Sequence, residues 1–480
     1  MNSKFKHRHS RAVLTLAATA LLVACSSPKV QPPTPAWSDA QLGLHTNAST
    51  TVPADWWTTW GDARLQALIG QALQDHPGMQ QAAARVRRAQ ASTQLANAAD
   101  RPQVGLGADF SRQRYSANGL FPKPIAGNTW NNDTLQISLG WTPDLWGEHA
   151  AALAAAVGQT RAAQADAAMA SQLLASQILR SSIGLARLLA QQDANTQMIA
   201  LRETVQDLVR QRHAAGLDTR IEQAQNEGAL AEWQTQHRAL QEQIALTRHQ
   251  LAVLCGLPPQ ALQDHAPRLD SYALSPLPAQ LGADLLGRRP DVVAARWRAE
   301  AAQQQTHVAR TQFYPSVNLG VFAGYNALGT QHLLEAGSRQ YGIVPALRLP
   351  LFEGGRLQAQ LSGREAERDL AVAQYKQAVL DAVREAADAI RSSDSAAQQA
   401  SDQARALAGA QQAFALAQQR EQAGLGNRLN LLSAQAALLG QQRASIDQQA
   451  RQLDVRVQLV RALGGGWPGE TQAAQATARP

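Results

Sequence analysis

Histidine and cysteine, whose side chains bind metals or act as nucleophiles, number 11 and 2 in this sequence of 480 residues. The 11 histidines are scattered, without the spacing that a metal site requires. Gly105 and Gly107 begin a dinucleotide-type pattern, but Phe110 stands where the third glycine belongs. The motifs of zinc proteases, α/β-hydrolases, P-loop proteins and thiol oxidoreductases are absent. The sequence therefore predicts neither an enzyme nor a metal protein, and it leaves the two cysteines as the residues to explain.

The first cysteine, Cys25, follows a leader of a recognisable kind. Four Lys or Arg residues precede an apolar run over residues 12–24, which is too short to span a bilayer. The string Leu-Val-Ala-Cys that ends at Cys25 resembles the lipobox of bacterial lipoproteins. That resemblance implies cleavage before Cys25, with a covalent diacylglycerol and an N-acyl chain on this residue. Ser26 is compatible with sorting to the outer membrane; the alternative is an ordinary secretory signal with a chance cysteine.

Removing this leader changes both the charge and the thiols of the chain. The formal net charge is +7, but residues 1–24 hold four basic residues and no acidic one, which leaves about +3. We therefore do not expect nucleic acid as a partner. Cys255, the remaining cysteine, ends an apolar helical stretch and cannot form an internal disulfide. We expect it to be a small buried hydrophobe, not a reactive thiol.

The sequence contains an internal duplication, with an offset of roughly 210 residues between corresponding features. Five landmarks recur in the same order, which chance rarely produces. The pairs are Pro77 with Pro290, Pro102 with Pro315, Leu145 with Leu351, Gly216 with Gly424, and Gly256 with Gly464. Each half therefore predicts a helix, two strands, a very long helix, a sharp turn and a second long helix.

Two very long helices dominate the expected structure. The first contains no proline, repeats its apolar residues every three or four positions, and would extend roughly 97 Å. Both long helices stop at Ala-Gly-Leu, where Gly216 and Gly424 permit a left-handed end. Helices of this length predict coiled-coil packing. The long helices are expected over 150–214 and 357–423, and the return helices over 219–254 and 428–463.

Four segments of alternating hydrophobicity lie between the helices. Each is about ten residues long, as a membrane β-strand requires, and alternation gives one apolar face and one polar or small face. Trp141, Tyr325 and Tyr341 near the strand ends suit an interfacial girdle. Four strands leave two unpaired edges that lipid does not tolerate, so several copies must pool their strands; the alternative is a soluble sheet with one buried face. The segments are 104–111, 135–141, 317–325 and 341–349.

Several strings together carry a resemblance to a known family. Arg-Arg-Pro-Asp at 288–291 and Pro-Leu-Phe-Glu-Gly-Gly-Arg at 350–356 are the most specific of them. The other stretches are Trp60–Ile69, Asp144–Gly147 and Phe313–Ser316. With them the chain resembles TolC-like outer-membrane efflux factors, in the NodT/OprM lipoprotein branch, from about residue 55 to residue 466. Residues 111–119 and 463–466 further resemble MdtP-like members.

The resemblance implies a mainly helical fold with membrane β-structure: a homotrimer with a 12-stranded β-barrel in the outer membrane and a periplasmic α-helical barrel. A periplasmic adaptor protein and an inner-membrane pump would dock at the far end, and drugs or small toxic organic compounds would leave through the duct. A coiled-coil lipoprotein that tethers the outer membrane to the envelope is the alternative, but it explains neither the strands nor the duplication. The expected divisions are a signal peptide (1–24), a lipidated tether and equatorial segment (25–60), two repeats (61–260 and 281–466) and a disordered tail (467–480).

The periplasmic entrance departs from the resemblance. Relatives carry one or two Asp residues just past the glycine of the second turn, whereas this chain has Asn430 and Ser433 there. Leu429 precedes Ser433 by one helical turn, so both can face one pore. We hypothesise that the entrance lacks an acidic ring and that Arg428 makes it neutral or positive, which would suit anionic cargo such as aromatic acids. The alternative is that these are ordinary polar residues of a helix tip.

The two helical turns are the expected contact with the adaptor protein. Gly216 and Gly424 permit close approach, and Leu217 and Leu425 each offer an apolar side chain. Helix termination by glycine explains the same glycines, and one glycine can serve both purposes.

Overall fold

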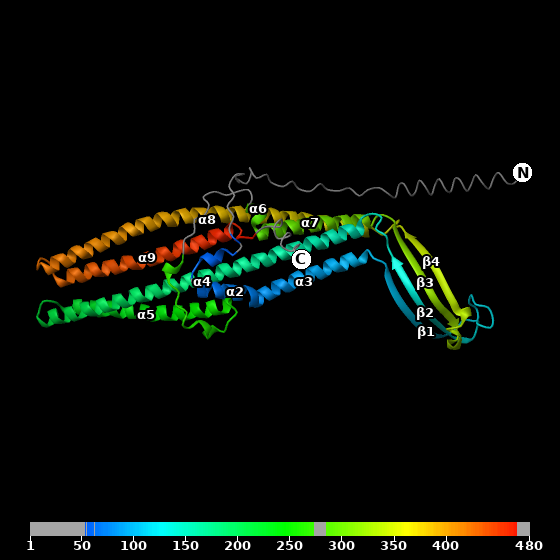
Figure 1. Ribbon diagram of the computed structural model, residues 1–480, viewed down its shortest axis with the longest axis horizontal. Helices are drawn as coiled ribbons and strands as arrows, with labels where there is room; N and C mark the ends of the chain where they lie inside the picture. Colours follow the sequence, from blue (N-terminus) through cyan, green and yellow to red (C-terminus); the bar gives the residue numbers. More distant parts are fainter. Residues whose placement is uncertain (1–52, 54, 62, 273–284, 468–480) are drawn as a thin grey trace. The chain divides into compact units, whose positions relative to one another are not determined.

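The computed structural model describes residues 53, 55–61, 63–272 and 285–467. These residues form long helices and one four-stranded sheet (Figure 1). They pack as two units, each of which takes segments from both halves of the sequence. The sheet unit comprises residues 87–162 and 296–374, and the helical unit comprises the other described residues.

The order of elements repeats as the duplication predicts. The series α3-β1-β2-α4-α5 in the first half is matched by α7-β3-β4-α8-α9 in the second. The long helices α4 and α8 are 67 residues each, and the return helices α5 and α9 are 35 residues each. The helices are α2 (Ala63–Asp75), α3 (Pro77–Ala99), α4 (Glu148–Ala214), α5 (Arg220–Leu254), α6 (Leu285–Arg288), α7 (Pro290–Thr311), α8 (Arg356–Gln422) and α9 (Arg428–Ala462). The strands are β1 (Gln103–Arg114), β2 (Thr129–Trp141), β3 (Ser316–Leu328) and β4 (Arg339–Arg348).

The sheet is an antiparallel meander in the order β1-β2-β3-β4, so β1 and β4 are its edges. The expected mainly helical fold with four strands is therefore confirmed. The first hairpin is longer than the alternating pattern predicts, because β1 continues to Arg114 and pairs with Thr129 of β2. Apart from Trp130, the residues of this extension are polar on both strands, so hydrophobic alternation could not detect it, whereas the backbone ladder continues there.

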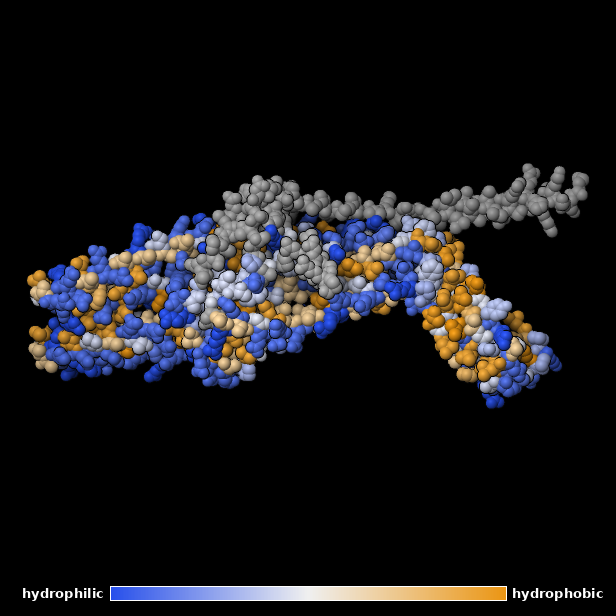
Figure 2. All heavy atoms as spheres, in the orientation of Figure 1, coloured by the Kyte–Doolittle hydropathy of each residue, from blue (hydrophilic) through white to orange (hydrophobic). Residues whose placement is uncertain are grey.

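The register sorts the strand side chains into two unlike faces, because residues directly opposite each other share a face. One face, called here the apolar face, carries large hydrophobic side chains that are more than half exposed, and Figure 2 shows hydrophobic residues over the strands. On the other face Asn326 donates to Thr134 at 2.8 Å, and Gln340 donates to Gln136 at 3.2 Å. Exposed members of the apolar face are Val104, Leu106, Phe110, Ile137, Tyr341, Ile343 and Leu347.

The core of the helical unit forms around the middle of α4. Ile178, Leu179 and Leu185 of this helix are fully buried, as the spacing of its apolar residues predicts. Trp56 and Trp60 join the same core at 3% and 2% exposure, so this aromatic cluster is packing, not a ligand platform. Within the described residues α4 alone is apolar enough over 18 residues to cross a membrane, but 56% of that stretch is buried inside the protein. The strands, not α4, therefore present the apolar surface.

Candidate functional site

The turn between α4 and α5 depends on a glycine with left-handed geometry. Gly216 has φ 76°, and the amide of Leu217 donates to the carbonyl oxygen of Arg212 at 2.8 Å. This hydrogen bond closes the helix end in the way that a glycine after the last helical residue allows. The side chain of Leu217 is 67% exposed just beyond the glycine. An apolar side chain is therefore presented at the end of the hairpin.

Side-chain hydrogen bonds fix the start of α5. Thr219 and Glu222 form a capping box. The Thr219 hydroxyl accepts a hydrogen bond from the backbone amide of Ile221, and the Glu222 carboxylate accepts one from the backbone amide of Thr219. Arg212 holds Asp218 with two hydrogen bonds of 2.9 Å. The bond from Arg212 is the main reason why the pKa of Asp218 lies below its usual value. The first tip is thus held by a glycine helix end, a capping box and the Arg212–Asp218 ion pair.

The turn between α8 and α9 reproduces this geometry at the corresponding positions. Gly424 has φ 71°, the amide of Leu425 donates to the carbonyl of Arg420 at 2.8 Å, and Leu425 is 73% exposed. Asn427 caps α9 by accepting a hydrogen bond from the amide of Asn430 at 2.8 Å. Both hairpins end at the same extremity of the helical unit (Figure 1). The structure therefore brings together the two tips that the sequence identified separately.

Of the four predicted entrance residues, Asn430 and Ser433 are exposed on α9 and Leu429 is half-buried. The neighbouring Leu432 is buried in one cluster with Met198 and Leu201 of α4, which turns this side of α9 inward. The face that carries Asn430 and Ser433 is consequently open to solvent.

Arg428 does not stand alone at this tip. Its guanidinium lies 3.2 Å from the carboxylate of Glu421 on α8, so its charge is partly compensated. Residues 420–433 contain two Arg and one acidic residue, and the corresponding residues 212–225 contain two Arg and two acidic residues. The tips are therefore close to neutral with a small positive excess, and Arg428 contributes less free charge than its sequence position alone indicates.

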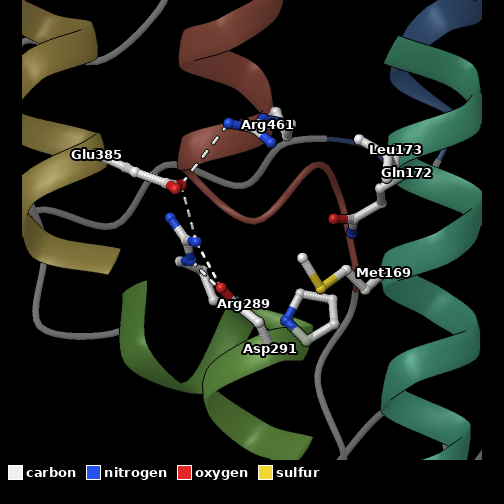
Figure 3. A pocket seen from close by; sticks show the side chains of 8 residues that line it. Met169, Gln172, Leu173, Arg289, Asp291, Glu385 and Arg461 are labelled. Carbon is white, nitrogen blue, oxygen red and sulfur yellow. Dashed lines mark hydrogen bonds and ion pairs between the residues drawn. The ribbon is translucent and has the colours of Figure 1, made fainter. Parts of the chain in front are cut away.

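A buried charge cluster lies in the helical unit, where the Arg-Arg-Pro-Asp string starts α7 (Figure 3). Arg289 donates to both oxygens of Asp291 at 3.0 and 2.6 Å and lies 3.0 Å from Glu385 of α8. It also donates to the carbonyl of Ala462 at 3.3 Å, and its side chain is only 7% exposed. Burial opposes the charged form, yet the two carboxylates raise the pKa of Arg289 above its usual value. Arg461 completes the cluster 3.8 Å from Glu385.

This cluster joins the start of α7, the middle of α8 and the end of α9. The sequence identified Arg289 and Asp291 through the family-like motif but gave no sign of Glu385 or Arg461. Because those partners are far apart in the chain and lie among many similar charges, no local pattern distinguishes them. The adjoining cavity, about 60 Å³, is small for an organic ligand and is lined also by Met169 and Gln172. The cluster therefore serves structure.

A second motif cluster lies in the sheet unit, where strands meet helices. Asp144 accepts a hydrogen bond from the amide of Ala150 at 2.9 Å and so caps α4. Burial raises the pKa of Asp144, but hydrogen bonds from backbone amides at the start of α4 lower it by more, so the pKa lies below its usual value. Trp146 stacks on Tyr314 with ring centres 5.1 Å apart and donates to the carbonyl of Pro315 at 2.7 Å. Strings from both repeats thus meet at one junction.

The two cysteines stand differently. Cys25 lies outside the described residues. Cys255 is 2% exposed at the end of α5, so the prediction of a buried thiol is confirmed, and burial raises its pKa to about 11. Among the described residues no group of His, Cys, Asp and Glu could hold a metal ion.

Comparison with known proteins agrees with this geometry. Residues 68–257 and 281–465 match the family model "Outer membrane efflux protein". The chain is 30% identical over 440 residues to the multidrug resistance outer membrane protein MdtP of Shigella flexneri, covering 88% of each chain. It is 36% identical over 318 residues to the fusaric acid resistance protein FusA of Burkholderia cepacia, covering 65% of this chain and 60% of FusA.

Solved structures extend the likeness to the fold. The crystal structure of the outer membrane protein VceC from Vibrio cholerae is similar with a TM-score of 0.79 and 35% identity, covering 86% of this chain and 99% of VceC. The resemblance inferred from the Arg-Arg-Pro-Asp and Pro-Leu-Phe-Glu-Gly-Gly-Arg strings is therefore confirmed. The two exposed hairpin tips, the apolar face of the sheet and the duplicated long helices all fit a duct, not a catalyst. The chain belongs to the outer membrane efflux protein family and is an efflux channel of the outer membrane, not an enzyme.

Proposed function

We propose that three copies of this chain assemble into one exit duct for drugs or small toxic organic compounds, fed by a periplasmic adaptor protein and an inner-membrane pump. The observation that carries this proposal is the open sheet of the single chain. Its edges are β1 and β4, and its apolar face exposes Leu106, Tyr341 and Ile343 by 70% or more. Soluble proteins seldom leave so large an apolar surface open to water.

Lipid would cover this face but would not satisfy the backbone groups along the two edges. Each unpaired group in hydrocarbon costs several kcal/mol, so an open sheet does not span a membrane. Because the meander has an even number of strands, β4 of one copy runs antiparallel to β1 of the next. Head-to-tail pairing of these edges closes a ring, and three copies give a barrel of 12 strands.

The assembly can be tested on the protein extracted from outer membrane with detergent. We expect a particle of three copies by light scattering that runs as a heat-labile oligomer on a gel. A monodisperse single copy that needs neither lipid nor detergent would contradict the proposal.

The anchor is a separate part of the proposal. We propose that residues 1–24 are a signal peptide and that Cys25 carries the diacylglycerol and N-acyl chains, since the Leu-Val-Ala-Cys string precedes it. Labelled palmitate should enter the wild-type protein and not Cys25→Ser. Labelling of both proteins would place the lipid elsewhere.

The tips are the proposed contact with the adaptor protein. Gly216 and Gly424 have no side chain, and the adjoining Leu217 and Leu425 are among the more exposed apolar side chains of the helical unit. A partner helix could therefore approach the backbone closely and bury both leucines. Each buried Leu would contribute about 1.5–3 kcal/mol.

Aspartate at both leucines should abolish export and cross-linking to the adaptor while the oligomer remains. Leu246→Asp is the matched control, because Leu246 is 57% exposed on α5. Unchanged export by the Leu217→Asp, Leu425→Asp double variant would contradict a contact at the tips.

Anionic compounds are the proposed cargo class. The entrance lacks an acidic ring at Asn430 and Ser433, and the charges of the surrounding turn leave a small positive excess. Such an entrance does not exclude anions in the way that a ring of carboxylates would. Similarity to a fusaric acid resistance protein supports an acid as cargo.

A further inference from the structure

The apolar face of β1 ends in cations. Along this face the side chains of Val104, Leu106 and Phe110 are 65–72% exposed, and the next two positions on the same face are Arg112 and Arg114. Alternate residues of a strand share a face, and two residues span about 7 Å. Arg112 is therefore the next residue after Phe110 on the apolar face of β1.

The other edge strand shows the same order of side chains. Read toward the hairpin loop, the apolar face of β4 carries Leu347, Ile343, Tyr341 and then Arg339. Tyr341 is 85% exposed and lies opposite Ala323. Both edges thus run from aliphatic to aromatic to arginine. This order matches a membrane strand at the boundary between hydrocarbon and headgroups.

The acids near this end have hydrogen-bond partners other than these arginines. Asp133 is 2% exposed and accepts a hydrogen bond from Thr330 at 2.6 Å. Glu335 is bonded to His332 at 2.8 Å. Between Phe110 and Asp133 the sequence contains no acid, and it adds another cation in the loop, Lys123.

The three arginines are exposed, and none of the ion pairs among the described residues involves them. In an outer membrane channel whose helices extend into the periplasm, the hairpin loops 115–128 and 329–338 face the exterior. The arginines therefore lie at the level of the outer leaflet's headgroups. Guanidinium groups bind phosphate oxygens in pairs and lose less hydration than an ammonium does.

We propose that Arg112 and Arg114 of one copy and Arg339 of the next form a binding site for the phosphate groups of an outer-leaflet lipid. The inference rests on the proposed trimer, because β1 and β4 are opposite edges of one sheet and meet only across a boundary between copies. A phosphorylated lipid would then bridge two copies at each seam. Removal of this lipid would therefore weaken the trimer at the boundaries between copies, where no covalent bond joins the chains.

The test uses the full-length trimer in detergent with lipid A that carries its phosphates and with phosphate-free lipid A. Native mass spectrometry counts bound lipid, and a gel records the temperature at which the trimer dissociates. The phosphorylated lipid should bind and raise that temperature more than the phosphate-free form does. The Arg112→Gln, Arg114→Gln, Arg339→Gln triple variant should still form trimers, since these side chains are exposed, but it should bind the phosphorylated lipid at least about tenfold more weakly.

Arg348→Gln is the matched control, because Arg348 is also exposed on β4 but lies at the opposite end of the strand. It should bind lipid as the wild type does. Equal binding of the two lipids, or unchanged binding by the triple variant, would overturn the site while the trimer stands. A single-copy wild type would instead refute the trimer. In that case Arg339→Gln would not weaken lipid binding beyond the effect of the Arg112→Gln and Arg114→Gln substitutions, and a site shared between two copies would be overturned.

Discussion

The Nε2 atom of Gln172 donates a hydrogen bond of 2.6 Å to the carbonyl oxygen of Gly464, and both residues are buried. Gln172 lies on α4 of the first repeat, and Gly464 follows α9 of the second. The bond therefore ties the two repeats together within the helical unit. It depends on a close approach of backbone that the consecutive glycines 464–466 permit.

Alanine should not be tolerated at Gly464. This glycine has φ +96°, and an added Cβ would lie 2.5 Å from the carbonyl oxygen of Arg288, which is backbone and cannot swing away. Left-handed strain and overpacking each cost on the order of 1–3 kcal/mol. We expect Gly464→Ala to lower the apparent melting temperature recorded by circular dichroism at a fixed heating rate.

Gly440→Ala is the matched control for this substitution. Gly440 lies inside α9 with nothing within 4 Å of an added Cβ and without a positive φ. Alanine is a better helix former than glycine by about 1 kcal/mol, so this variant should be as stable as the wild type or more so. Equal melting temperatures for both variants would show that the close approach at Gly464 does not matter.

The fold was largely predictable because periodicity is a local signal and the duplication repeats it at a nearly constant offset. The spacing of Leu174, Ile178 and Leu185 gave α4, and the two Ala-Gly-Leu strings gave its end and that of α8. The polar outer part of the first hairpin was missed, since Arg112 to Arg114 lack alternating hydrophobicity. Backbone pairing there follows from the neighbouring ladder and not from the side chains.

Arg289 should be far more sensitive than an exposed arginine of the same helix bundle. Arg289→Met leaves Asp291 and Glu385 as partly buried carboxylates without their main cation. Breaking a buried pair in this way costs about 3–5 kcal/mol. Arg405→Met is the control, since its side chain is 79% exposed beside Asp402 and such pairs contribute about 0–1 kcal/mol.

A double substitution separates charge from packing at this cluster. If uncompensated charge causes the loss in Arg289→Met, adding Glu385→Gln should restore part of the stability, measured by the same melting experiment. Additive losses from the two substitutions would mean that the charges do not interact.

The thiol of Cys255 should resist alkylation in the folded protein. Its pKa is raised to about 11 by burial, so the reactive thiolate is scarce at pH 8.5. Because the pKa of this thiol is higher in the folded than in the unfolded protein, the protonated thiol favours folding below its usual pKa, and this contribution to stability is lost as the pH rises toward 11. In Cys25→Ser, iodoacetamide should modify Cys255 only after denaturation.

An exposed thiol on the same helix provides the comparison for Cys255. Val253 is 55% exposed on α5, so Val253→Cys should react in the folded state. Modification of native Cys255 at the rate seen for Val253→Cys would contradict its burial.

The candidate site was less predictable than the fold. The tip leucines and the entrance positions followed from counting along the chain, because a turn and its flanking helices are local. The partner of Arg428 did not follow, since Glu421 lies on the preceding helix across the turn and many Arg and Glu residues are similarly spaced. Edge arginines such as Arg339 gained meaning only when the register placed them on the apolar face.

Acidic residues introduced at the entrance should change its ion selectivity. Asn430 and Ser433 are exposed one turn apart on α9, so Asn430→Asp with Ser433→Asp adds two carboxylates per chain. In a trimer these form rings that concentrate cations and narrow the way for anions. Single-channel recordings should therefore show a shift toward cation selectivity and a new block by trivalent cations.

The wild-type channel should lack both properties, and Asn430→Gln, which changes size but not charge, should behave like it. The added charge acts through solvent, so its effect should weaken as salt rises and the Debye length falls below about 10 Å. Strong cation selectivity with trivalent block in the wild type would contradict the neutral entrance, because some other acid would then line the pore. Export assays on the same variants should show anionic compounds losing more than neutral ones, since the carboxylate rings repel only the former.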